Sequence, residues 1–135
     1  MKVFEALNEP TANEFYNLKN IKLFLAWGIT NCDDWQSKVI DELNAFSLDD
    51  LMIFNPRRKH FDASDKNASQ KQIEWEFKYL NSMDIFTMYF TNSENSVQPI
   101  CLYELGRHLE RMIHRFPGDW KDRIIIGIEN GYSRT

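Results

Sequence analysis

Short apolar runs alternate with longer amphipathic segments along most of this chain. Four runs rich in β-branched and aromatic residues, IKLFLA, LMIF, IFTMYF and RIIIGI, predict strands at residues 21–26, 51–54, 85–90 and 123–128. The helical spacing of apolar residues predicts helices near residues 33–47, 69–82 and 99–115. The runs LMIF and IIIGI are continuously apolar, which is typical of parallel strands covered on both faces. We therefore predict an α/β fold, a three-layer sandwich with a parallel sheet and right-handed crossovers.

Each predicted helix has an apolar stripe that should face the sheet. In the first helix, which Asp33 or Asp34 can cap, the stripe consists of Trp35, Val39, Leu43 and Phe46. In the second helix it consists of Ile73, Phe77 and Leu80. In the third helix, where Pro99 suits the first turn, it consists of Leu102, Leu105, Leu109, Met112 and Ile113. Residues 1–20 show no clean period, so we treat them as an N-terminal arm and residues 21–135 as the domain.

The length and composition are those of one soluble domain. A chain of 135 residues predicts a single domain, and 43% hydrophobic with 14% aromatic residues excludes a disordered chain. The formal net charge of -4 lacks the basic excess of a general DNA or RNA binder, so we expect no nucleic-acid partner. No apolar run reaches the roughly 18 residues of a membrane span, and the first ten residues leave no room for a signal core. We expect a reduced, cytoplasmic protein that does not bind membranes.

The common metal and cofactor motifs do not occur in this sequence. The three histidines and the two cysteines, Cys32 and Cys101, match no zinc-ligand spacing, and HExxH and CxxC are absent. GxGxxG, GxxxxGK[ST] and GxSxG are absent too, which leaves no signature for dinucleotide, P-loop or elbow-serine chemistry. We therefore expect neither a metal nor a cofactor.

The fold class itself predicts where a ligand would bind. In helix-covered parallel sheets, ligands bind beyond the carboxyl ends of the strands. The candidate substrate-binding residues at these ends are Ala26, Trp27, Gly28, Asn55, Arg57, Arg58 and Asn130, and Gln98, just before the third predicted helix, is a further candidate. Arg57 and Arg58 belong to the one dense basic cluster, RRKH, which could hold a phosphate or carboxylate and could equally be a solvated loop. If the protein acts on 5′-monophosphates, we predict that it needs Arg57 or Arg58.

Two glutamates in the predicted helices are candidates for chemistry. Glu76 lies at the edge of its helix's apolar face, where a carboxylate is costly unless it is paired, although a snorkelling Glu would fit the pattern as well. Glu104 lies near the expected ligand edge, opposite the apolar stripe of its helix, and taken alone it would count as an ordinary exposed Glu. Gly106 follows it inside the helix, where close approach of another segment would explain a glycine. Two carboxylates at one pocket could perform glycoside chemistry.

Four segments together resemble the nucleoside 2-deoxyribosyltransferase-like family. They are FLAWGITNCDDWQ at 24–36, NPRR at 55–58, QIEWE at 72–76 with Asp84 eight positions after Glu76, and PICLYELG at 99–106. The resemblance covers about residues 21–135. It implies a flavodoxin-like, Rossmann-like parallel sheet and cleavage of the N-glycosidic bond of (deoxy)nucleosides or nucleotides. It also implies that the sugar passes to another base or to water, and that the protein assembles as a homo-oligomer.

The resemblance assigns roles to individual residues. Glu104 falls at the position of the family's nucleophile, which would form a covalent glycosyl ester, and Glu76 falls where an acidic residue contacts the base. Gly28 and its neighbours fall in the turn that lines the sugar pocket. Two positions depart from the pattern: Gln98 replaces an Asp found in some relatives, and Trp27 stands where Gly is usual.

Three functions therefore remain open from the sequence. The first is an enzyme, either a deoxyribosyltransferase or an N-glycosidase. The second is a catalytically inactive nucleotide-binding module of the same fold, which the departures at Trp27 and Gln98 favour. The third, a structural or interaction protein, has weak support.

Overall fold

The four predicted strands lie side by side in one parallel sheet. The computed structural model describes residues 1–29, 32–59, 64–91 and 99–132, with the side chains of 99–102 left out. Within these ranges the sheet has five strands in the order β1-β3-β2-β4-β5, and every neighbouring pair is parallel. The strands are β1 (Lys2–Glu5), β2 (Ile21–Ala26), β3 (Leu51–Asn55), β4 (Ile85–Phe90) and β5 (Ile124–Ile128).

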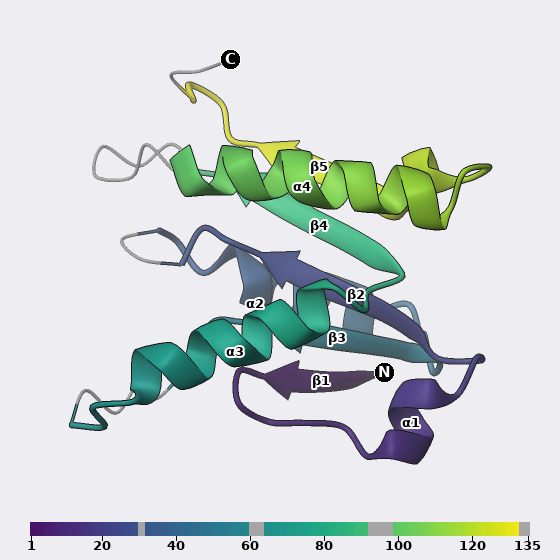
Figure 1. The fold of residues 1–135 in the computed structure, drawn as a ribbon, viewed down its shortest axis with the longest axis horizontal. Coiled ribbons are helices and arrows are strands. Elements are labelled where there is room, and N and C mark those ends of the chain that lie inside the picture. The colour runs from purple at the N-terminus through teal and green to yellow at the C-terminus, as the bar shows by residue number, and fades with distance from the viewer. Residues whose placement is uncertain (30–31, 60–63, 92–98, 133–135) are drawn as a thin grey trace.

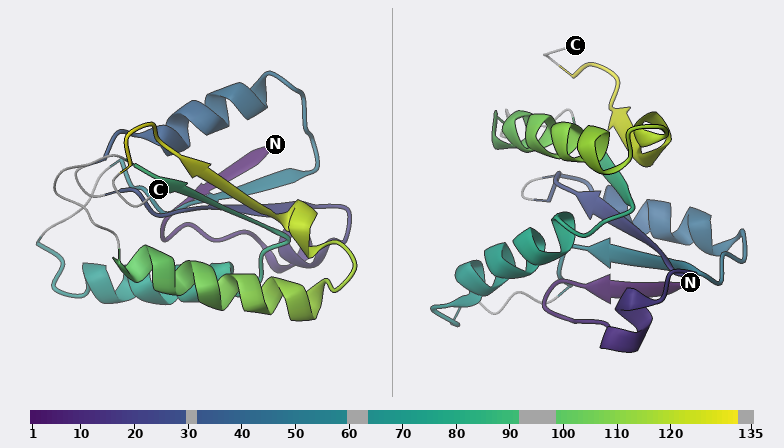
Figure 2. Two further views of the ribbon diagram at one scale, coloured as in Figure 1. Left: turned by 90° about the horizontal axis from the view of Figure 1, so that it is seen from above. Right: turned by 45° about the vertical axis from the view of Figure 1, so that its right-hand side comes forward.

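Helices cover both faces of this sheet and complete a three-layer α/β sandwich. They are α1 (Ala12–Tyr16), α2 (Trp35–Asn44), α3 (Ala68–Leu80), α4 (Pro99–Arg115) and the 3₁₀ turn η1 (Trp120–Arg123). Figure 1 shows α3 and α4 in front of the sheet and α2 behind it. The left view of Figure 2 shows the sheet between α2 on one side and the pair α3 and α4 on the other. The predicted fold class is confirmed, as are Pro99 at the start of α4 and Asp34 as the N-cap of α2.

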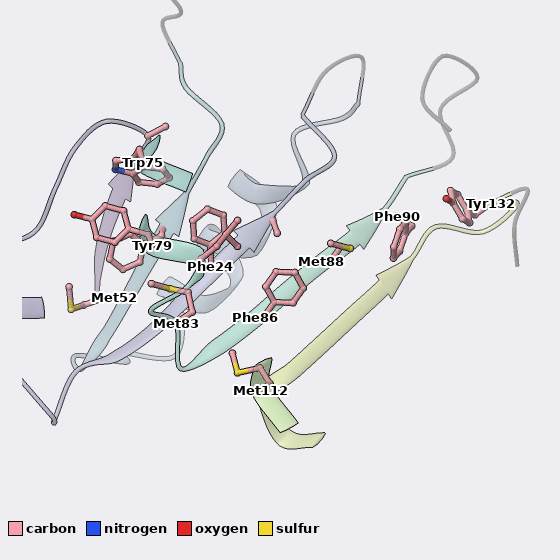
Figure 3. Packing of buried hydrophobic residues seen from close by; sticks show 14 residues of the cluster. Phe24, Met52, Trp75, Tyr79, Met83, Phe86, Met88, Phe90, Met112 and Tyr132 are labelled. Atoms are coloured by element: carbon pink, nitrogen blue, oxygen red, sulfur yellow. The ribbon is translucent and has the colours of Figure 1, made fainter. Parts of the chain in front are cut away.

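Two apolar clusters, one on each face, hold the layers together. The larger one lies under α3 and α4 and brings Phe24, Phe86 and Met88 of the sheet against helical side chains (Figure 3). The smaller one lies under α2, where Leu25 and Ile53 are fully buried. Strand β3 is buried at every position, as its continuous apolar run predicts. None of the helices in the described part of the chain is long and apolar enough to cross a membrane.

The N-terminal residues do not form the expected arm. Lys2–Glu5 pair in register with β3 as an edge strand, and the ring of Phe4 stacks on Phe54 with centroids 5.4 Å apart. The turn that follows is tied to α3, because the Trp75 Nε1–H donates to the Asn8 carbonyl over 2.8 Å. The prediction of an arm was therefore wrong for this strand.

Three expectations about burial were also wrong. In α3, Ile73 and Phe77 are exposed, and Trp75 and Tyr79 are buried in their place. Phe46 lies beyond the end of α2 and is exposed. Strand β5 is not covered on both faces, because its residues Ile125, Ile126 and Ile128 are 53%, 42% and 50% exposed. Being the last strand of the sheet, β5 has a neighbour on one side only.

The glycine inside α4 has no packing role among the described residues. A Cβ added at Gly106 would meet nothing within 4 Å there, so no described segment makes the expected close approach. We expect Gly106→Ala to stabilise the protein by about 1 kcal/mol, because alanine costs less backbone entropy in a helix. This corresponds to a rise of roughly 3–4 °C in the thermal midpoint, measurable by circular dichroism.

A contrasting glycine variant controls for this prediction. A Cβ at Gly127 in β5 would collide with the ring of Tyr89, so Gly127→Ala is expected to lower the midpoint. If Gly106→Ala also lowered it, a segment must pack against that helix position after all.

Candidate functional site

The carboxyl ends of all five strands meet at one edge of the sheet. Since the strands are parallel, the arrowheads in Figure 1 point to the same edge, and α3 and α4 begin there. The turn after β2 lies at this edge. Ala26, the last residue of β2, is buried, and Trp27 and Gly28 follow it with φ angles of 68° and 69°. Two consecutive left-handed residues reverse the chain sharply, and for Trp27 this conformation carries strain.

Helix α2 fixes this turn. The Trp27 carbonyl accepts hydrogen bonds from Trp35 Nε1 at 2.9 Å and from Gln36 Nε2 at 2.8 Å. A Cβ added at Gly28 would lie 2.8 Å from Trp35 Nε1, so the turn requires glycine for space as well as for conformation. The indole N–H of Trp27 itself is buried and has no hydrogen-bond partner in the described part of the protein.

Arg57 is occupied by main-chain contacts. Its Nη2 donates to three carbonyls of the β2–α2 connection, those of Gly28 at 2.8 Å, Cys32 at 3.1 Å and Asp33 at 3.0 Å. Its Nε donates to Gln36 Oε1 at 3.1 Å. The Asn55 side chain accepts from the Arg57 backbone N–H at 3.0 Å, which shapes the turn after β3. Asn55 thus shapes the turn after β3, and Arg57 ties this turn to the β2–α2 connection.

Arg58 points toward α3. Its Nη2 lies 3.5 Å from the carbonyl of Ala68, the first residue of α3, and the side chain is half-buried. Burial raises the pKa of the Glu76 carboxyl, and the positive charge of Arg58 opposes this rise. Of the two arginines proposed from the sequence, Arg58 is the one whose charge reaches Glu76.

Glu76 lies on the sheet-facing side of α3. Trp75 directly precedes it, Gln72 and Tyr79 lie one turn before and after it, and both aromatic residues are buried. Gln72 Nε2 donates to Glu76 Oε1 at 2.8 Å and also to the Pro56 carbonyl at 2.8 Å. Burial is the main cause of a raised pKa for Glu76; the Gln72 hydrogen bond opposes it, and the nearby negative charge of Glu104 adds to it.

Glu104 faces the core from α4. Its side chain is 19% exposed, and one turn later His108 is only 1% exposed. The expectation that Glu104 lies opposite the apolar face was therefore wrong, because His108 and the buried Met112 follow it at four-residue spacing. Arg107 approaches Glu104 to 3.9 Å and also stacks over the Phe77 ring of α3, 5.3 Å from its centroid.

The two carboxylates lie within electrostatic reach of each other, across α3 and α4. The negative charge of Glu104 makes ionisation of Glu76 less favourable, and burial acts in the same direction. Two carboxyl groups whose environments separate their protonation states can act as an acid and as a nucleophile or base. The geometry therefore supports a division of labour between Glu76 and Glu104.

The other candidates contribute less to this arrangement. Asn130 is exposed in the turn after β5, and Gln98 and His60 lie outside the described residues. Asp84 lies at the opposite edge, where it accepts from the Lys22 N–H at 2.9 Å before β4 begins. No group of three His, Cys, Asp or Glu side chains suited to a metal ion occurs among the residues that the structure describes.

Sequence reasoning missed the polar neighbours of both glutamates. Gln72 lies four residues before Glu76, and His108 four residues after Glu104. This spacing places each pair on one helix face, so it was a usable signal. What the sequence could not show is that these faces point inward.

Known proteins provide an independent comparison. A family model described as "Nucleoside 2-deoxyribosyltransferase like" matches residues 20–114, which is more than two thirds of the chain. The matched range includes Glu76 and Glu104, whereas β1 and β5 lie outside it. No curated protein matches the chain.

Proposed function

Because the chain belongs to the nucleoside 2-deoxyribosyltransferase-like family, we propose that it cleaves the N-glycosidic bond of a (deoxy)nucleoside or nucleotide and passes the sugar to another base or to water. The observation that carries this proposal is the pair of half-buried carboxylates, Glu76 on α3 and Glu104 on α4. A pair of this kind provides the two functions that glycoside cleavage needs, an attacking oxygen and a proton source.

The proposed reaction is a double displacement. An oxygen of ionised Glu104 attacks C1′, the C1′–N bond breaks, and its electron pair leaves with the base. The leaving base receives a proton from Glu76 or from water. A second base or water then attacks C1′ of the glycosyl ester and gives its proton to the Glu76 carboxylate or to solvent, while Glu104 departs as a carboxylate. Two inversions at C1′ give net retention of configuration.

The turn after β2 supports substrate binding at this edge. Trp27 has a strained, left-handed backbone that α2 holds in place, and such strain often occurs at functional sites. Trp27 also supports the alternative function, an inactive nucleotide-binding module, since its bulk stands where relatives have glycine. Homo-oligomerisation remains a proposal too, and the exposed isoleucines of β5 offer an apolar surface for it.

One incubation separates these alternatives. The protein is mixed with deoxynucleosides or their monophosphates, with and without a second free base, and released base is followed by chromatography. Base exchange that requires the acceptor indicates a transferase, and release without an acceptor indicates a hydrolase. If no substrate turns over while binding saturates, the binding module is correct and the enzyme is excluded.

If monophosphates are substrates, Arg58 is expected to select them. We expect Arg58→Gln to raise the KM for a 5′-monophosphate about tenfold, because a charge-assisted contact to phosphate is lost. The KM for the parent nucleoside should change less than about threefold. Steady-state kinetics on both substrates measure the difference.

Lys59 provides a matched control, because it is the next basic residue along the chain and it is exposed. Lys59→Gln removes the same charge and should leave both KM values unchanged. An equal rise in KM for nucleoside and monophosphate in Arg58→Gln would show that Arg58 has no role in phosphate recognition.

A further inference from the structure

His108 is a buried polar group that the proposed reaction does not yet use. Its Nε2 lies 3.2 Å from Glu104 Oε2, within donor–acceptor distance. The N–H direction is not aligned for a hydrogen bond in this arrangement, and among the described residues Nε2 has no other partner. A buried N–H without a partner is costly, and the Glu104 carboxylate is the acceptor within reach of it.

Arg111 determines which ring nitrogen of His108 carries the proton. The Arg111 Nε–H donates to His108 Nδ1 over 3.3 Å, so Nδ1 must offer its lone pair. In a neutral imidazole the proton then lies on Nε2, the nitrogen that faces Glu104. Burial, followed by the charges of Arg111 and Arg107, lowers the pKa of His108 to about 4, so the ring is neutral around pH 7.

Three elements fix the orientation of this ring. Arg111 is anchored on the C-terminal carbonyls of α3, with Nη2 2.6 Å from Leu80 O and Nη1 2.9 Å from Asn81 O. The imidazole stacks on Phe86 of β4, with centroids 5.1 Å apart and an interplanar angle of 26°. The end of α3, Arg111 of α4 and Phe86 of β4 therefore hold His108 in one position relative to Glu104.

We propose that His108 is a positioning residue, whose Nε2–H donates to Glu104 Oε2 and leaves the other carboxylate oxygen free to attack C1′. This role rests on the proposed function. A carboxylate on a flexible side chain attacks efficiently only when one of its oxygens is held close to the reacting carbon. The charged groups that face this pair are Arg107 and Arg111 from α4, and Glu76 from α3.

Two substitutions distinguish positioning from packing. His108→Leu keeps an apolar side chain against Phe86 and removes the donor, whereas His108→Gln keeps an N–H near the position of Nε2. We expect His108→Leu to lower kcat about 10- to 100-fold with KM changed less than about threefold. His108→Gln should recover kcat to within about fivefold of the unsubstituted protein. His114, 78% exposed near the end of the same helix, is the control, and His114→Leu should leave both constants unchanged.

A second measurement does not depend on turnover. In the unsubstituted protein, ¹⁵N chemical shifts of the His108 ring should report the neutral Nε2–H form between pH 6 and 8, and Glu104→Gln should shift the Nε2 resonance. An Nδ1–H form, or an Nε2 resonance that ignores Glu104→Gln, would overturn the proposal.

The kinetic and spectroscopic outcomes distinguish a failure of the proposed function from a failure of the role of His108. If the unsubstituted protein turns over no substrate, the proposed function fails and the positioning role fails with it, whatever the ring shifts show. If it turns over substrate and His108→Leu keeps full kcat, or His108→Gln loses as much kcat as His108→Leu, only the role of His108 is wrong.

Discussion

Glu104→Ala is expected to reduce kcat for nucleoside cleavage by at least about a thousandfold. Without the carboxylate no glycosyl ester can form, and the remaining path is direct attack by water on the bound substrate. The side chain is half-buried and its only close partners are His108 and Arg107 among the described residues, so the fold should survive its removal. Steady-state kinetics give the loss, and thermal unfolding confirms that the variant is folded.

Mass spectrometry gives this prediction a second readout. An acid-quenched reaction of the unsubstituted protein should contain a species heavier by one sugar residue, and Glu104→Ala should contain none. Glu110, 77% exposed on the same helix, is the matched control, and Glu110→Ala should retain full activity and the adduct. If Glu104→Ala kept its activity, the assignment of the nucleophile would be wrong. Activity without any adduct in the unsubstituted protein would indicate a single displacement.

The central strands of the sheet could be predicted from the sequence, but the edge strand β1 could not. Strands β2, β3 and β4 have apolar residues on both faces, so the composition alone marks them. β1 offers only Val3 and Phe4 between polar residues, and it is stabilised by pairing with β3 and by the stacking of Phe4 on Phe54. These contacts are tertiary, so no local sequence pattern could predict that residues 2–5 form a strand.

The sequence also could not show which face of α3 packs against the sheet, and this face determines how Glu76 is placed. The sequence offers two apolar faces, one with Ile73 and Phe77 and one with Trp75 and Tyr79. The second is buried, because Tyr79 stacks on Phe54 at 4.6 Å between centroids and Trp75 packs against Phe24 at 5.8 Å. Large aromatic rings that match rings on the sheet bury more area than the alternative face. The sequence pattern places Glu76 at the edge of the Ile73 and Phe77 face, which is exposed. Glu76 is nevertheless half-buried, because it lies beside the Trp75 and Tyr79 face.

Arg57 illustrates why a basic cluster is a weak predictor of a ligand. Its position after β3 could be predicted from topology. The sequence could not predict that the guanidinium binds three carbonyls of the β2–α2 connection, because main-chain acceptors leave no signature in the sequence. His108 is the opposite case: it lacked a metal-ligand spacing and so drew no attention, although Arg111 and Phe86 hold it against Glu104.

Glu76→Gln is expected to lower kcat about 100- to 10,000-fold, the usual contribution of a general acid, and to change the pH profile. Burial raises the pKa of Glu76 above that of an exposed glutamate. The acid is therefore available at pH values where an exposed Glu would be ionised, and the rate falls as the pH rises through this raised pKa. Glutamine cannot titrate, so the residual rate of the variant should lack this alkaline limb.

The same raised pKa makes a stability prediction that needs no substrate. The folded protein holds the Glu76 proton more tightly than the unfolded chain, whose Glu titrates near ~4.3. The free energy of unfolding therefore falls as the pH rises from the unfolded pKa through the folded one. Glu76→Gln should gain stability relative to the unsubstituted protein over that window, measured by urea unfolding at several pH values. Glu74→Gln, at an exposed position of α3, should not.

The pH profile of kcat/KM and the stability measurement both report the ionisation of the free protein, so their results are linked. The alkaline limb of kcat/KM and the pH window of the stability difference should give the same pKa. If the stability difference has this window and the alkaline limb survives in Glu76→Gln, then Glu76 is buried as the structure shows and another group is the acid. If the limb disappears and the stability difference does not depend on pH, the acid role holds and burial does not raise its pKa.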